Sequence, residues 1–306
     1  MTARTVSIGA PFRWLMKAID VGRRNPRALF GGFAIVVLVS LVPTVVQMVL
    51  QALLADSPTL MWSLYGLVML ASVLAMPPLT GAAIRLLHAC ESGQPAAALD
   101  VFNGYRDGAF ALRMVLTSLL LFAFYLVLMG LLFALMPAKE AMVEFFTIAM
   151  ATPPGGQPDM SGLDFDPASL PWLFLWMVGA MAALFTAMHV QLLATTHAAL
   201  SGQGPLHALL SGITGTLRNV VPLTAFTLSM LVIGFVAVFL LVLVLGLLAV
   251  VLAMVSPVLA GVVLLPLYLA SILVLVVVLY GFYYHAWREV FGDTAADPMG
   301  HRRLSQ

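Results

Sequence analysis

The chain has 306 residues, of which 62% are hydrophobic and only 9% are charged, and its formal net charge at pH 7 is +1. Ordinary soluble domains are about 25% charged, so this composition excludes a soluble globular protein. The apolar runs are continuous rather than alternating, which excludes a membrane β-barrel. A single cysteine, Cys90, excludes an intrachain disulfide framework. The net charge says nothing about nucleic acid, and we expect no nucleic-acid partner.

Six apolar segments are each long enough to cross a hydrocarbon core of about 30 Å as an α-helix. They cover approximately residues 28–54, 60–87, 111–136, 170–196, 220–253 and 258–284. The long basic leader before the first segment differs from a cleavable signal peptide. The last two segments meet at Ser256-Pro257 without any nearby charge, so three spans in this stretch remain an alternative. We predict an all-α polytopic membrane protein with six transmembrane helices in a single membrane domain over residues 1–306.

Charged residues are distributed unequally between the two sides of the six spans. The N-terminal leader, the 88–110 and 200–219 loops and the 288–306 tail share one side, which holds or borders every Lys and Arg except Lys139. The opposite side carries acidic residues, namely Asp56, Glu140, Glu144, Asp159, Asp164 and Asp166. The positive-inside rule therefore predicts that both termini face the cytoplasm.

A short motif recurs where apolar segments end. It reads HACESGQ at 88–94 and HAALSGQ at 197–203, with a fainter third copy that starts at His285-Ala286. Each unit opens with a proline followed by the apolar face of an interfacial helix, and these prolines are Pro11, Pro95 and Pro205. We predict three parallel helical-hairpin repeats, each preceded by a cytoplasmic interfacial helix, packed around a pseudo-threefold axis or as two plus one. The units cover about 11–93, 95–203 and 205–293.

A basic residue followed by Asn or Asp precedes the first span of each unit, and the pairs are Arg24-Asn25, Arg106-Asp107 and Arg218-Asn219. The Asn or Asp is predicted to cap the N-terminus of the span, and the arginine to reach lipid phosphate. The first histidine of each motif copy occupies an equivalent place at the end of a span. The candidate ligand or head-group residues are thus His88, His197, His285, Arg24, Arg106 and Arg218. Alternatively, the histidines are amphipathic anchors at the membrane surface.

Three polar residues lie inside the spans, namely His189, Gln191 and Gln47. A polar or ionisable side chain at membrane depth is a candidate intramembrane site. The alternative is that these residues form hydrogen bonds between helices.

The outer loop 137–169 departs from the repeated pattern. Residues 137–150 are predicted to form a short amphipathic helix on the outer leaflet, and a flexible acidic segment rich in Pro and Gly follows it. The acidic residues of that segment do not have the spacing of a calcium loop, so we predict no metal site. A lid or a docking site for a partner is an alternative role for the loop.

Known catalytic motifs are missing from the sequence, including those of zinc hydrolases, serine hydrolases and P-loop proteins. Carboxylates are also missing from the interiors of the spans, which argues against an ordinary proton- or ion-driven pump. We therefore expect no enzymatic activity and no cofactor.

The N-terminal pattern, in which Trp14 and an apolar-basic helix precede Arg24-Asn25-Pro26, resembles that of an uncharacterised family of six-span proteobacterial inner-membrane proteins. The resemblance extends loosely over the whole chain, including the SGQ-type loops. That family is distantly similar to the membrane-anchor domains of some glycerophosphodiester phosphodiesterases. The catalytic barrel of those enzymes is absent here, so the resemblance implies a location in the bacterial inner membrane and no phosphodiesterase activity.

The function expected from these features is the binding or translocation of an amphipathic substrate, a lipid or a lipid-linked molecule. Apolar interiors rich in Met and Phe, helices interrupted by proline and basic cytoplasmic rims favour it. The alternative is a non-catalytic scaffold or interaction subunit of a cell-envelope assembly that docks through the 137–169 loop. The expected partners are membrane lipids, with an envelope protein or a second copy of the chain as further possibilities.

Overall fold

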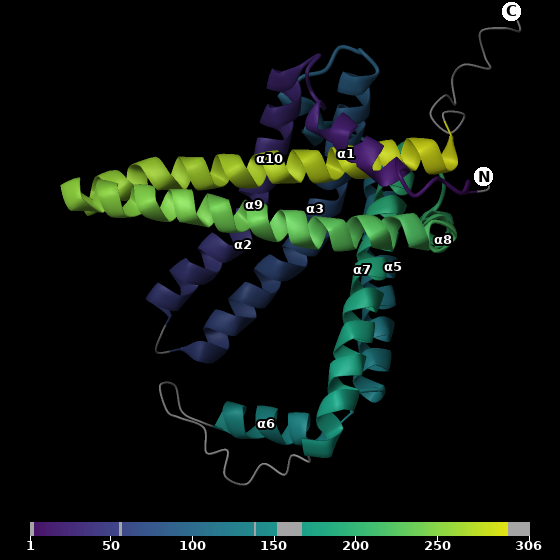
Figure 1. Cartoon of the computed structure of the whole chain (residues 1–306). Coiled ribbons are helices and arrows are strands. Elements are labelled where there is room, and N and C mark those ends of the chain that lie inside the picture. The colour runs from purple at the N-terminus through teal and green to yellow at the C-terminus, as the bar shows by residue number, and fades with distance from the viewer. Residues whose placement is uncertain (1–2, 55–56, 138, 152–166, 293–306) are drawn as a thin grey trace, which may run out of the picture. The chain divides into compact units, whose positions relative to one another are not determined.

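The structure is a computed structural model that describes residues 3–54, 57–137, 139–151 and 167–292. Helices dominate these ranges and no strand occurs in them (Figure 1). The helices are α1 (Ala10–Ile19), α2 (Pro26–Leu53), α3 (Pro58–Glu91), η1 (Ala98–Phe102), α4 (Asn103–Arg106), α5 (Gly108–Ala134), α6 (Lys139–Ala151), η2 (Pro167–Ser169), α7 (Leu170–Leu200), α8 (Pro205–Arg218), α9 (Val220–Val255) and α10 (Pro257–Phe291).

Six of these helices are long and apolar enough to cross a membrane, namely α2, α3, α5, α7, α9 and α10. This confirms the predicted all-helical fold with six candidate spans. The residues from 220 to 291 form two helices that meet at Ser256, so the alternative of three spans in this stretch is wrong. Ser256 separates them because its Oγ accepts a hydrogen bond from the Leu259 N–H at 3.4 Å and Pro257 opens α10.

Packing divides the chain into two units, one of Met1–Leu120 with His189–Gln306 and one of Leu121–Met188. In the first unit α2 pairs with α3 and α9 with α10, while α10 also packs against α1, α2 and α3 (Figure 1). In the second unit the Trp176 indole of α7 donates to the Leu132 carbonyl of α5 at 3.0 Å. The arrangement of the three hairpins about one axis stays a prediction.

The outer loop contains α6, which confirms the short helix predicted over 137–150. The acidic segment that follows it, with Asp159, Asp164 and Asp166, lies outside the described residues. The end of the C-terminal tail, from residue 293, also lies outside them.

Two of the three predicted caps form. The Asn25 Oδ1 accepts from the Ala28 N–H at 3.2 Å, and the Asp107 Oδ1 accepts from the Phe110 N–H at 3.0 Å, so each satisfies a donor that the first turn of a helix leaves unpaired. The prediction is wrong for Asn219, which has no capping bond. Its Oδ1 accepts from the Val6 N–H at 2.8 Å, so this side chain holds the N-terminal segment instead.

The prolines Pro11 and Pro205 lie in the first turns of α1 and α8, as predicted. The middle segment differs, because η1 and the four-residue α4 replace a continuous helix after Pro95. One cause is local, since the Asp100 carboxylate accepts from the Ala97 N–H at 2.7 Å and tightens the first turn. Close packing against α3 is a second cause. A Cβ atom added at Gly104 would lie only 2.4 Å from the Pro78 carbonyl oxygen, so the backbone of this segment approaches α3 closely.

Each copy of the motif lies at the C-terminal end of a candidate span. Gly93 and Gly202 have φ angles of 71° and 74°, and Gly292 after the third copy has 79°. These left-handed conformations suit glycine and terminate α3, α7 and α10. The motif is therefore a C-terminal helix stop in all three places.

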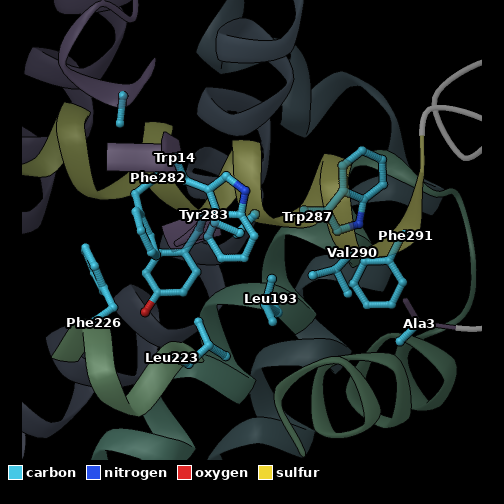
Figure 2. Close-up of a cluster of buried hydrophobic side chains, with 13 residues drawn as sticks. Ala3, Trp14, Leu193, Leu223, Phe226, Phe282, Tyr283, Trp287, Val290 and Phe291 are labelled. Atoms are coloured by element: carbon cyan, nitrogen blue, oxygen red, sulfur yellow. The ribbon is translucent and has the colours of Figure 1, made fainter. Parts of the chain in front are cut away.

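The buried core lies at one end of the helices of the first unit. A cluster of 13 buried residues joins the N-terminal segment, α1, the end of α7, the start of α9 and the end of α10 (Figure 2). Trp14 packs edge-on against Phe282 with ring centroids 5.6 Å apart, and Phe226 stacks on Phe282 at 4.4 Å. By contrast, the most apolar windows of α9 and α10 are only 0% and 6% buried, as expected for side chains that face lipid.

Candidate functional site

A charged pocket of about 470 Å³ lies where α1 and the turn after it meet the ends of α3 and α10. Its lining residues are Lys17, Asp20, Arg24, Glu91, His285, Arg288 and Glu289. The volume falls within the range of about 300–1,000 Å³ that is usual for small-molecule sites. Three basic and three acidic side chains line it, so their formal charges cancel. The pocket suits a polar group that carries both signs of charge.

Helical spacing explains how α10 supplies three lining residues. His285, Arg288 and Glu289 stand at positions i, i+3 and i+4, which fall on one face of a helix. Lys17 on α1 and Asp20, the residue that caps the C-terminus of α1, are three residues apart and are neighbours for the same reason. The α10 face and the α1 face thus meet across the pocket.

The turn between α1 and α2 brings Arg24 to the end of α3. Gly22 makes this turn possible with a φ of 85°, where a side chain would also come within 2.7 Å of Leu29 Cδ2. The Arg24 Nη1 donates to the carbonyl of Glu91, the last residue of α3, at 2.7 Å. In return the Glu91 Oε1 accepts from the Gly22 N–H at 3.3 Å. This wall of the pocket is therefore held by both backbone and side-chain groups.

The opposite wall is held by Glu289. Its Oε1 accepts from the Arg13 Nη2 at 3.0 Å, and its Oε2 accepts from the indole Nε1 of Trp14 at 2.7 Å. Trp14 is fully buried, so its N–H needs a partner within the protein. Glu289 consequently attaches α1 to α10 and keeps both of its oxygens engaged.

His285 is the unsatisfied group of the pocket. Its side chain is only 9% exposed, and its Nε2 has no hydrogen-bond partner among the described residues. A buried polar atom left unpaired costs about 1–3 kcal/mol. A ligand that offers a hydrogen bond to this nitrogen would recover that free energy.

The other two motif histidines approach the same stretch of α10 without lining the pocket. His88 Nδ1 lies 3.0 Å from the Tyr284 hydroxyl. His197 is fully buried, and its Nδ1 accepts from the Trp287 indole at 3.1 Å. Its Nε2 therefore carries the proton and donates to the Gln203 Oε1 at 3.0 Å. The three equivalent positions in the sequence thus have three different environments.

The three predicted arginines also lie in different places. Arg24 lines the pocket with His285, whereas Arg218 donates from its Nη1 to the Ala3 carbonyl at 2.6 Å and holds the N-terminal segment. Arg106 is exposed at the end of α4 and is not a lining residue. Of the six predicted head-group residues, the structure therefore brings Arg24 and His285 together.

The intramembrane candidate His189 forms interhelical hydrogen bonds. Its Nε2 lies 2.8 Å from the Thr227 Oγ1, and its Nδ1 lies 2.5 Å from the Tyr283 hydroxyl. Because the Thr227 hydroxyl donates to a backbone carbonyl, it accepts from Nε2–H, and Nδ1 accepts from the tyrosine. Both ring nitrogens are occupied, and the ring links α7, α9 and α10. Gln191 is exposed, and Gln47 is half-buried.

Most of the pocket was missed by the sequence reasoning. Lys17, Asp20, Glu91, Arg288 and Glu289 were not among the candidates. The available signal was a difference between the motif copies: their fourth position holds Glu91 in the first, Leu200 in the second and Arg288 in the third. Glu91 and Arg288, the charged residues at that position, both line the pocket.

Arg85 and Arg113 were also not among the predicted candidates, and their role is structural. The Arg113 Nε donates to the Ala198 carbonyl at 3.0 Å and the Arg85 Nε to the Ala199 carbonyl at 3.1 Å, at the end of α7. Arg85 also lies over the Phe110 ring, 3.6 Å from its centroid. These side chains satisfy carbonyls that the last turn of α7 leaves unpaired.

Comparisons with known proteins add no relative, because no family model, curated protein or solved structure matches the chain. Within the described ranges, no group of three or more His, Cys, Asp or Glu side chains is placed to hold a metal ion. The charged pocket is accordingly the site on which a function is argued.

Proposed function

We propose that this protein binds an amphipathic lipid or lipid-linked molecule and that the charged pocket holds the polar head group. The observation that carries the proposal is the buried, unpaired Nε2 of His285 in a pocket lined by Lys17, Arg24 and Arg288. A lipid phosphate oxygen supplies the acceptor that an imidazole N–H lacks, and basic side chains attract the phosphate.

The place of the pocket along the helices supports this ligand. Glu91 ends α3, and His285, Arg288 and Glu289 lie in the last turns of α10. Both helices are candidate spans, so their ends lie at the depth of lipid head groups. Under the orientation that the basic residues predict, this is the cytoplasmic leaflet.

An apolar stripe beside the pocket supports an amphipathic ligand. Phe12, Met16 and Ile19 follow one another at helical spacing on α1 and are 39%, 65% and 59% exposed. Lys17 and Asp20, one residue further along, line the pocket. Because α1 is not a candidate span, this exposed apolar stripe needs a cover, and lipid chains at the membrane surface provide one.

The alternative function, an interaction subunit that docks through the 137–169 loop, depends on residues 152–166, which lie outside the described ranges. Translocation would add movement of the bound molecule across the membrane, and binding is the step that the pocket supports. The proposed function is therefore binding.

Native mass spectrometry of the purified protein tests the proposal. The wild type should retain lipid through mild delipidation, and Lys17→Ala should retain several-fold less, as expected for the loss of one charge-assisted contact of about 1 kcal/mol. Arg27→Ala is the matched control, because it removes a basic residue that is exposed and outside the pocket. Equal retention by all three proteins would refute the pocket as the lipid site.

A further inference from the structure

We infer that the pocket selects a zwitterionic head group in which a phosphodiester stands next to a primary ammonium, as in phosphoethanolamine, over an anionic head group. This inference rests on the proposed function and specifies its ligand class. The charges of the pocket that remain available after the contacts within the protein determine which head group fits.

The acidic side has two carboxylates with remaining acceptor capacity. Both oxygens of Glu289 are engaged by Arg13 and Trp14, so this residue belongs to the wall. Asp20 pairs with Arg23 at 3.5 Å, but the two side chains are 65% and 79% exposed, and solvent screening makes such a pair weak. Glu91 uses one oxygen for a 3.3 Å bond from the Gly22 N–H. A carboxylate accepts about four hydrogen bonds, which leaves both groups able to receive an ammonium.

The basic side has donors that suit a phosphate. The Lys17 ammonium offers three N–H groups, and the Arg24 guanidinium offers five, of which one is donated to the Glu91 carbonyl. The unpaired His285 Nε2 adds one more hydrogen-bonding group to the same pocket. A phosphodiester oxygen between these groups would satisfy the buried nitrogen.

Charge balance then decides between head groups. An anionic head group, such as phosphoglycerol, would place its negative charge among three carboxylates and leave Asp20 and Glu91 without a new partner. An ammonium next to the phosphate matches both sides of the pocket. A trimethylammonium carries the same charge but has no N–H, so it cannot hydrogen-bond to the carboxylates. Comparing the binding of choline and ethanolamine head groups therefore distinguishes the contribution of hydrogen bonds from that of charge.

Native mass spectrometry of the delipidated full chain tests the inference with three phospholipids of identical acyl chains. We expect the ethanolamine lipid to be retained at least about five-fold more than the glycerol or choline lipid. Replacing both carboxylates, in Asp20→Asn with Glu91→Gln, should abolish that preference. Glu140→Gln is the control, because it neutralises an exposed carboxylate outside the pocket. Thermal unfolding of each variant shows that it is folded.

The outcomes separate the two claims. If Lys17→Ala lowers retention of all three lipids while the wild type prefers none of them, the lipid site stands and the zwitterionic selectivity is wrong. If retention is independent of Lys17, the proposed function itself fails. Soluble phosphoethanolamine is the last arm: if it binds as tightly as the lipid, the head-group chemistry is upheld and the proposed lipid nature of the ligand is overturned.

Discussion

Glu289 joins α1 to α10 through two contacts of different kinds, and substitutions there separate their contributions to stability. The contact with the Trp14 Nε1 is buried and 2.7 Å long, whereas the Arg13 ion pair is 3.0 Å long with side chains that are 55% and 35% exposed. Glu289→Ala leaves the fully buried indole N–H without an acceptor. Glu289→Gln keeps a carbonyl oxygen that can accept from it.

The magnitudes follow from this difference. Leaving the indole N–H unpaired costs about 1–3 kcal/mol. Losing an exposed ion pair costs about 0–1 kcal/mol. The sum predicts that Glu289→Ala lowers the free energy of unfolding by about 1–4 kcal/mol, and Glu289→Gln by about 1 kcal/mol or less.

Unfolding of the purified variants in mixed micelles, by titration with a denaturing detergent and followed by tryptophan fluorescence, measures both values. The matched control is Arg13→Ala, which removes the ion pair and leaves the indole bond in place. It should resemble Glu289→Gln. If Glu289→Ala is no less stable than Arg13→Ala, the buried indole bond does not hold α1 in place, and the account of this wall is wrong.

Three further predictions concern the ends of the helices and the buried histidine. Gly202→Ala places a side chain at a φ of 74° where no neighbouring atom lies within 4 Å, so the strain of the backbone alone should lower stability in the same titration by about 1 kcal/mol; Gly204→Ala, at a φ of −66°, should change little. Asn219→Ala removes the two hydrogen bonds, from the Val6 N–H and to the Arg4 carbonyl, that hold the N-terminal segment, and limited proteolysis should cut that segment several-fold faster while the rest of the chain stays resistant. Tyr283→Phe removes the donor to His189 Nδ1 and should lower stability by about 0.6–2 kcal/mol; unchanged unfolding would mean that the ring is held by packing alone.

Local features of the fold could be predicted because their causes lie within a few residues. The Asn25 and Asp107 caps bind N–H groups three residues away, and Gly93 ends α3 through its own backbone conformation. The third cap failed because Asn219 has a competing partner at Val6, more than 200 residues away in the sequence, which no local pattern reveals.

The candidate site was only partly predictable for the same reason. His285 and Arg24 stood out through the repeated motif and the Arg-Asn pair, but the pattern placed His88 and His197 in the same category. The partners that distinguish them, such as Trp287 for His197, are known only once α10 is packed. Repetition therefore indicated where the helices end and did not indicate which of those ends forms a pocket.

The sequence by itself determined the class of the protein, the six apolar helices and the glycine stops that end three of them, because hydrophobicity over one span and backbone conformation at one residue are local properties. The tertiary structure decided that Lys17 of α1, Asp20 just after it, Glu91 of α3 and His285 of α10 line one pocket. Those residues are separated by up to hundreds of positions, and their proximity depends on the cluster around Trp14 that packs α1 against α10. Their charges acquire a shared role only through that packing.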